Sequence, residues 1–132
     1  MTSERYLVDT TIWVRYFSGE ASVEDRVRAL ILQDKVLTAG IIILEILRGA
    51  RSAAEYNQLY RDFKALPALS IDTSVWEESY KMGFKLRKAG VTVPLADILI
   101  STLAICHECP LMHRDKHFSL IAQYSKLKEY PV

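Results

Sequence analysis

Short apolar runs alternate along the chain with longer segments in which apolar residues recur every third or fourth position. The short runs are typical of buried strands, and the wider spacing is typical of helices that turn one face toward a core. The short runs predict strands at residues 6–8, 36–38, 69–71, 110–113 and 127–130. The longer segments predict helices at residues 12–19, 22–33, 41–48, 52–66, 73–90, 95–107 and 116–124.

Polar residues, proline and glycine mark where these helices begin and end. Thr10 or Thr11 is predicted to cap the first helix, and Thr73 the long helix that stops at Gly90. Pro94 is expected to open the helix that follows, because proline suits a first turn.

The alternation of strands and helices predicts a three-layer α/β/α domain with a mainly parallel central sheet of four or five strands. The length of 132 residues is most simply accounted for by one domain, residues 1–132. In sheets of this kind, ligands bind beyond the carboxyl ends of the strands. Candidate functional residues are therefore sought at that edge.

Four carboxylates fall at or near the predicted edge. Asp9 follows the first strand and Asp115 the fourth, Glu45 lies in the helix after the second strand, and Asp97 lies in the first turns of the helix after Pro94. Repulsion among several half-buried carboxylates must be neutralised, and Mg²⁺ or Mn²⁺ meets that need because both prefer oxygen ligands. The acids therefore suggest a divalent metal site.

Each acid also has a purely structural interpretation. Asp9 is well placed to cap a helix, and Asp97 to favour the positive end of its helix. Glu45 is three residues from Arg48, a spacing at which the two side chains form a modest ion pair. Asp115 suits an ordinary turn. The sequence leaves these alternatives open for each residue taken alone.

Composition narrows the function classes. The formal net charge is +1, so no global field points to nucleic acid or membrane. The N-terminus lacks the apolar core of a signal peptide, and the apolar runs are too short to cross a bilayer. The chain has two cysteines, which favours a cytoplasmic protein without a disulfide scaffold.

The spacing Cys106-x₂-Cys109-x₃-His113-x₃-His117 superficially suggests a zinc site. Cys106 is predicted to end a helix, and His113 to lie in a core strand, which would hold these side chains apart. Buried, unreactive cysteines are the preferred interpretation.

Four stretches of the chain together resemble a known family. They are YLVDTTIWV at 6–14, LEILRGAR at 44–51, PLADILISTLAI at 94–105 and LMHRDKHFS at 111–119. In this order they resemble a PIN domain of the VapC type, the toxin ribonuclease of type II toxin–antitoxin systems. Two positions depart from the family's pattern. His113 stands where Thr or Ser is usual, and Gly40 where a hydroxyl residue is common.

The resemblance implies a metal-dependent endoribonuclease that forms a homodimer and is paired with a cognate antitoxin protein. It implies that Asp9 and Asp97 are the principal ligands of Mg²⁺ or Mn²⁺, that Glu45 binds directly or through water, and that Asp115 holds a second ion or a metal-bound water. Thr11 is a candidate to support a water held by the ion.

Two basic clusters are candidates for contacts with RNA phosphates, although a solvated helix face is the preferred interpretation of each cluster taken alone. Their members are Arg48, Arg51, Lys81, Lys85, Arg87 and Lys88.

Two other functions stay open. The first is a catalytically silent PIN-like module that binds RNA or protein. The second is a phosphotransfer domain, which also places an aspartate after its first strand. That alternative fits poorly, because Asp9 is followed by Thr10 and Thr11 rather than by the Asp-x-Asp pattern of the haloacid dehalogenases.

Overall fold

Five strands form one sheet in the order β3-β2-β1-β4-β5, and every neighbouring pair is parallel. The computed structural model describes residues 4–132, and of Pro131 the backbone alone. The strands are β1 (Tyr6–Val8), β2 (Val36–Ala39), β3 (Ala68–Leu69), β4 (Leu111–His113) and β5 (Glu129–Pro131). The sequence prediction of a mainly parallel sheet of four or five strands is confirmed.

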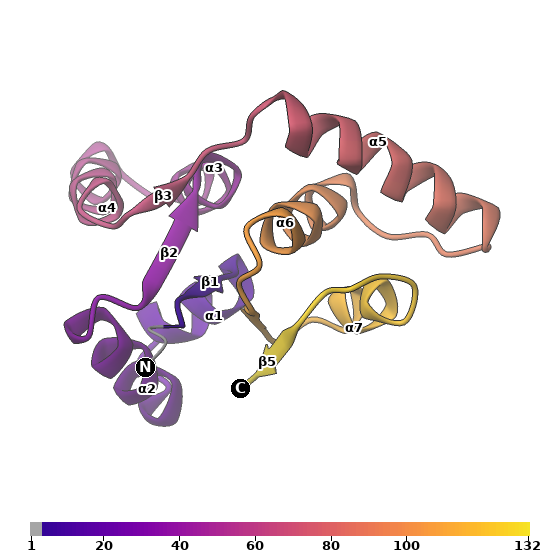
Figure 1. The fold of residues 1–132 in the computed structure, drawn as a ribbon. Helices are drawn as coiled ribbons and strands as arrows, with labels where there is room; N and C mark the ends of the chain where they lie inside the picture. The colour runs from indigo at the N-terminus through magenta and orange to yellow at the C-terminus, as the bar shows by residue number, and fades with distance from the viewer. Residues whose placement is uncertain (1–3) are drawn as a thin grey trace.

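Seven helices of the described part of the chain flank this sheet and complete the three layers (Figure 1). They are α1 (Thr10–Phe17), α2 (Ala21–Leu32), α3 (Gly40–Arg48), α4 (Ala53–Lys64), α5 (Thr73–Lys88), α6 (Leu95–Cys106) and α7 (Lys116–Ala122). Figure 1 shows α5 as an outer helix lying along α6. None of the described helices has the length and apolar character needed to cross a membrane.

The order of the strands reverses around β1. From β1 the chain adds β2 and β3 on one side, and it then returns to add β4 and β5 on the other side. Leu7 of β1 pairs with Leu37 of β2 and with Leu111 of β4, so β1 is central and fully buried at this position. The loops that leave β1 and β4 diverge at such a reversal and open a crevice at the carboxyl ends of the two strands.

The core lies between the sheet and the helices, and α6 is its most buried helix. Every residue of α6 from Asp97 to Ala104 is buried, because α5 and α7 both pack on this helix. Trp13 and Leu30 belong to the core, whereas Trp76 is exposed.

The threonines predicted to cap α1 and α5 do not cap these helices, and Asp9 has the capping role that the sequence left open for it. The caps of α1 and α5 are Asp9 and Asp72, each one position or more before the predicted threonine. Their carboxylates accept backbone N–H bonds from Thr11 and Val75, which a carboxylate at the position before the helix does well. Pro94 occupies the cap position of α6 and lies just outside the helix.

The remaining differences are small shifts at element ends. β3 covers Ala68–Leu69 rather than 69–71, because it pairs with Thr38 and Ala39 of β2 and then turns toward the Asp72 cap. β5 lies at Glu129–Pro131 rather than at 127–130, in register with the three residues of β4.

Candidate metal centre

Asp9 and Asp115 lie at the carboxyl ends of the two neighbouring central strands. Asp9 follows β1 and caps α1, and its backbone N–H donates to the carbonyl of Met112 in β4 (3.0 Å). Asp115 follows β4 after one intervening residue and caps α7. Each of these acids is therefore a helix cap at the crevice where the strand order reverses. The capping interpretation of Asp9 is confirmed, whereas Asp115, expected as a turn residue, caps a helix instead.

Asp97 is the acid whose charge is hardest to accommodate. It lies in the first turn of α6 with 8% of its surface exposed, and its Oδ2 is buried without a hydrogen-bond partner. Burial, followed by the negative charges of Asp115 and Asp9, raises the pKa of Asp97 from the ordinary value of 3.8 to about 7. Glu45 acts in the same direction, whereas His117 acts in the opposite one.

The negative charges of Asp115, Asp9 and Glu45 all raise the pKa of Asp97, so the fold brings these acids within electrostatic reach of Asp97. Across the described residues, no lysine or arginine forms an ion pair with any of the four. Their mutual repulsion is thus left without a permanent cationic side chain. A buried cluster of this kind calls for a bound cation.

Glu45 reaches the cluster from α3. Its Oε1 accepts a hydrogen bond from the Thr10 hydroxyl at 2.8 Å, which ties the middle of α3 to the start of α1. The alternative ion pair with Arg48 is absent, although both residues are described. A tertiary contact has thus replaced the local pairing that the sequence spacing suggested.

Thr11 fixes the direction of the Asp9 carboxylate. Its backbone N–H and its hydroxyl both donate to Asp9 Oδ2, at 3.0 and 2.7 Å. The same hydroxyl accepts the backbone N–H of Arg114 at 3.1 Å, so Thr11 also holds the segment that leads to Asp115. Burial raises the pKa of Asp9, and the hydrogen bonds from Thr11 oppose that rise.

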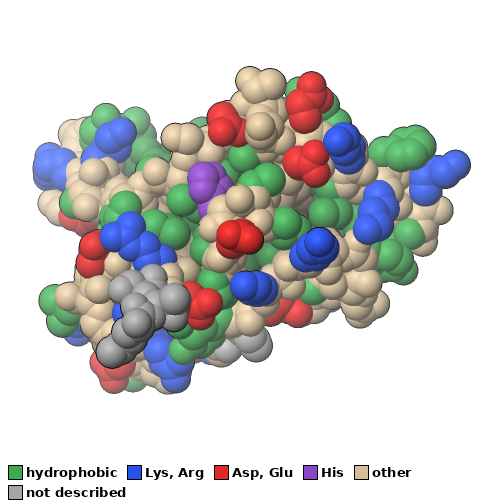
Figure 2. All heavy atoms as spheres, in the orientation of Figure 1, with side chains coloured by type: hydrophobic (Ala, Val, Ile, Leu, Met, Phe, Trp, Pro, Cys, Tyr) green, Lys and Arg blue, Asp and Glu red, His purple; other side chains and the backbone are tan. Residues whose placement is uncertain are grey.

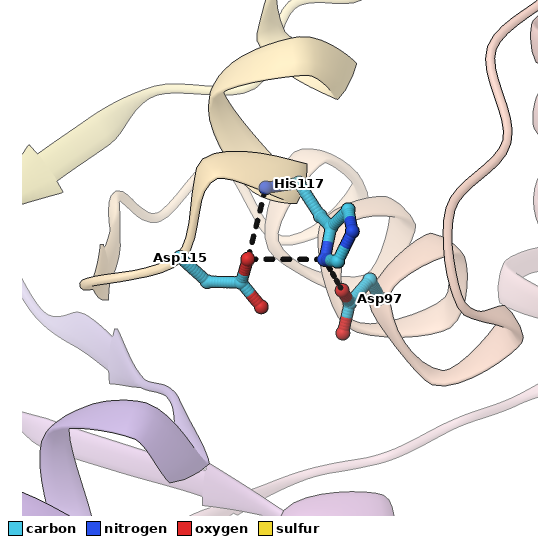
Figure 3. Close-up of side chains that lie close together, drawn as sticks. All are labelled: Asp97, Asp115 and His117. Carbon is cyan, nitrogen blue, oxygen red and sulfur yellow. Dashed lines mark hydrogen bonds and ion pairs between the residues drawn. The ribbon is translucent and has the colours of Figure 1, made fainter.

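His117 is a member of the cluster that the sequence analysis missed. Its Nδ1 lies 3.0 Å from Asp115 Oδ1 and 3.5 Å from Asp97 Oδ2, as Figure 3 shows. Its backbone N–H donates to Asp115 Oδ1 at 2.9 Å. The signal in the sequence was its position two residues after Asp115, in the first turn of the following helix.

One oxygen or nitrogen atom from each of Asp97, Asp115 and His117 lies within 4.8 Å of the others, a spacing that suits a single ion. The zinc arrangement considered from the cysteines does not form among the described residues. The expectation of buried cysteines is confirmed for Cys109 and wrong for Cys106, which is exposed. His117 lies against the two aspartates instead.

His113, which departs from the family's pattern, supports Asp115 through a hydrogen bond to its backbone. It is 3% exposed, and its Nδ1 accepts the backbone N–H of Asp115 at 3.1 Å. Its Nε2 therefore carries the proton and donates to Glu129 Oε1 at 2.9 Å. Ser119 donates to the same oxygen at 2.7 Å. The imidazole thus takes a structural place between β4, β5 and the cap of α7.

Comparison with known proteins agrees with this arrangement. The PIN domain family model matches residues 6–124. The chain belongs to the PIN domain family. Ribonuclease VapC11 of Mycobacterium tuberculosis is 33% identical to this PIN domain over 127 residues, covering 92% of this chain and 95% of that ribonuclease. At that identity and coverage, this PIN domain is a member of the VapC ribonucleases.

Solved structures share the fold of this PIN domain. VapBC2 from Rickettsia felis, bound to a DNA fragment from its promoter, aligns with a TM-score of 0.81 and 17% identity, covering 96% of this chain and 98% of that chain. VapBC-1 from nontypeable Haemophilus influenzae aligns with a TM-score of 0.76 and 19% identity, covering 96% of both chains. These matches confirm the predicted α/β/α PIN fold.

The six basic residues predicted to contact RNA are all exposed. Across the described residues, none of the six forms an ion pair with the four acids. Lys81 pairs with Glu78, and Lys88 lies over the ring of Phe84. Figure 2 shows several Lys and Arg side chains over α5, with hydrophobic side chains between them.

Proposed function

We propose that this PIN domain is a metal-dependent endoribonuclease, the toxin of a toxin–antitoxin pair, which hydrolyses RNA phosphodiester bonds at Asp9, Glu45, Asp97 and Asp115. One observation carries the proposal. A buried Asp97 carboxylate oxygen has no hydrogen-bond partner and faces other acids that no lysine or arginine neutralises in the described part of the chain.

The donor set fits Mg²⁺ or Mn²⁺. Asp9 and Asp97 are the proposed principal ligands because they are the most buried of the four, and Glu45 and Asp115 complete the site. When bound, such an ion activates water for attack on phosphorus and stabilises the charge that develops on the phosphate. The proposed products carry 5′-phosphate and 3′-hydroxyl ends.

The chain's own residues prepare the site for this role. The paired hydrogen bonds from Thr11 hold the Asp9 carboxylate in one direction, and the Thr10 hydroxyl does the same for Glu45. Carboxylates held in this way need little reordering when a cation arrives, which favours binding. We propose this orienting role for Thr11 in place of the support of a water molecule.

RNA, a cognate antitoxin and a second copy of the chain are the proposed partners, and a cytoplasmic location belongs to the same proposal. The VapBC neighbours share this fold, and VapBC is by name a family of toxin–antitoxin systems. Three of the helices that offer apolar contact area at the surface each expose more than one large apolar side chain. The exposed large apolar side chains there are Val14 and Phe17 of α1, Tyr56 and Tyr60 of α4, and Trp76, Tyr80 and Phe84 of α5.

Cleavage of structured RNA by the purified chain, freed of any partner, tests the proposal. We expect cutting with Mg²⁺ or Mn²⁺, none with EDTA, and none with Asp9→Asn or Asp97→Asn. Asp25→Asn, which changes an exposed acid of α2, is the matched control and should cut normally. If both site variants cut as fast as the wild type, the acids are not the catalytic site. If wild type neither binds Mn²⁺ nor cuts RNA, the silent binding module is the better description.

A further inference from the structure

The imidazole of His117 occupies a position that the four-acid site does not explain. Its Nδ1 is buried and lies between two carboxylates, Asp115 at 3.0 Å and Asp97 at 3.5 Å (Figure 3). Neither contact has the geometry of a hydrogen bond, so Nδ1 and Asp97 Oδ2 are both left without a hydrogen-bond partner. Buried polar atoms are nearly always paired in proteins, so these two unpaired atoms suggest a binding position for a third atom between them.

The backbone fixes the ring in this place. His117 lies in the first turn of α7, directly under the Asp115 cap, and its N–H donates to Asp115 Oδ1 at 2.9 Å. Asp115 in turn donates its backbone N–H to His113 Nδ1. The same short segment at the start of α7 therefore carries both His117 Nδ1 and the Asp115 carboxylate. Little rearrangement is needed for both groups to bind one ion.

We infer that His117 is a nitrogen ligand of the ion held by Asp97 and Asp115, and that it makes the site select Mn²⁺ over Mg²⁺. The inference rests on the proposed function, because it assumes that the acids hold a divalent ion. It adds a ligand and an ion preference that the four acids alone do not specify.

The preference follows from the chemistry of the two ions. Mg²⁺ requires nearly ideal octahedral geometry and strongly favours oxygen ligands and water. Imidazole nitrogen binds first-row transition ions more readily than it binds Mg²⁺, and Mn²⁺ is a member of that series for which carboxylates and water are also suitable ligands. A site of three or four carboxylates and one imidazole is thus a better match for Mn²⁺ than a site of carboxylates alone.

Metal titration and electron paramagnetic resonance of bound Mn²⁺ test this directly. The full chain, treated with EDTA and freed of any partner, is titrated with Mn²⁺ and separately with Mg²⁺ in a calorimeter at about pH 8, where an ordinary imidazole is neutral. We expect wild type to show coupling between Mn²⁺ and a ligand nitrogen. We expect His117→Asp to lose that coupling and to lower the ratio of Mn²⁺ to Mg²⁺ affinity by about tenfold.

Two controls keep the outcomes distinct. His107→Ala alters an exposed histidine after α6 and should leave both the coupling and the affinity ratio unchanged. Circular dichroism checks that each variant folds. If Mn²⁺ binds wild type without nitrogen coupling, or the ratio is unchanged in His117→Asp, the inference about His117 fails while the metal site stands. If wild type binds neither ion, the proposed function fails as well.

Discussion

Neutralising Asp97 should stabilise the metal-free protein in a manner that depends on pH. Asp97→Asn replaces a buried carboxylate by a neutral side chain of nearly the same shape. In the wild type this group has its pKa raised to about 7 by burial and by the neighbouring acids. The folded state therefore holds a proton on Asp97 more tightly than the unfolded state, in which the ordinary value of 3.8 applies.

The sign of the effect follows from proton linkage. Between pH 3.8 and about 7, the folded state binds more protons at Asp97 than the unfolded state does. The contribution of Asp97 to wild-type stability is therefore greatest below pH 4 and falls as the pH rises toward about 7. A difference of about three pKa units corresponds to about 4 kcal/mol of destabilisation at pH 8. At pH 5, which lies between the two pKa values of Asp97, the destabilisation is about 2 kcal/mol.

Asparagine brings its own cost, because its amide is buried where Asp97 Oδ2 has no partner. An unsatisfied buried polar group costs about 1–3 kcal/mol. We therefore expect a net gain for Asp97→Asn of about 1–3 kcal/mol at pH 8. The asparagine cost does not change with pH, so the advantage of the variant should fall by about 2–3 kcal/mol between pH 8 and pH 5.

Urea unfolding followed by circular dichroism measures this difference. Wild type and Asp97→Asn are compared at pH 5 and pH 8 in EDTA, at one protein concentration so that any oligomer contributes equally. Asp25→Asn, on the exposed face of α2, controls for the loss of a carboxylate in general. An advantage for Asp97→Asn that is the same at both pH values would refute the electrostatic account. Addition of Mn²⁺ should reverse the order, because only the wild type gains stability from binding.

Three further substitutions test the supports of the site and of the helices. Thr10→Val should lower RNA cleavage by about tenfold because Glu45 loses its hydroxyl donor, and Thr10→Ser should restore most of the rate. Glu129→Ala should cost about 1–3 kcal/mol in urea unfolding, because it leaves the buried Nε2–H of His113 without an acceptor, whereas Glu129→Gln keeps an acceptor and should cost less. Gly40→Ala should raise the free energy of unfolding by about 0.4–1 kcal/mol, because Gly40 begins α3 and has open space where the methyl group would lie.

The sequence was sufficient for the order of strands and helices because apolar spacing reports burial directly. It was less informative at the ends of helices, where several neighbouring residues are able to act as the cap. In the segments around Asp9 and Asp72, an aspartate directly precedes threonine, and either side chain is able to cap a helix. The carboxylates prevail in the structure because each is able to accept the N–H of the first helical turn from its position before the helix.

The site was predictable where a residue follows a strand, and less so where packing brings distant helices together. Asp9 and Asp115 follow from the rule for parallel sheets alone. Glu45 bonds to Thr10, which lies 35 residues away, rather than to Arg48 three residues away. His117 was missed because its partner Asp97 lies on another helix, and only the packing of α7 on α6 brings the two together.

The cost of Asp97 itself argues for a cation at this site. A penalty of about 4 kcal/mol at pH 8 is a large part of the 5–15 kcal/mol by which a typical domain is stable. A binding module with no use for an ion would gain by replacing Asp97 with a neutral or apolar residue. A metal site gains by keeping it, because the same repulsion that destabilises the empty cluster is relieved when the ion binds, and that relief adds to the affinity for the ion. The buried, unpaired carboxylate thus supports the proposed metal site better than it supports a purely structural role in the fold.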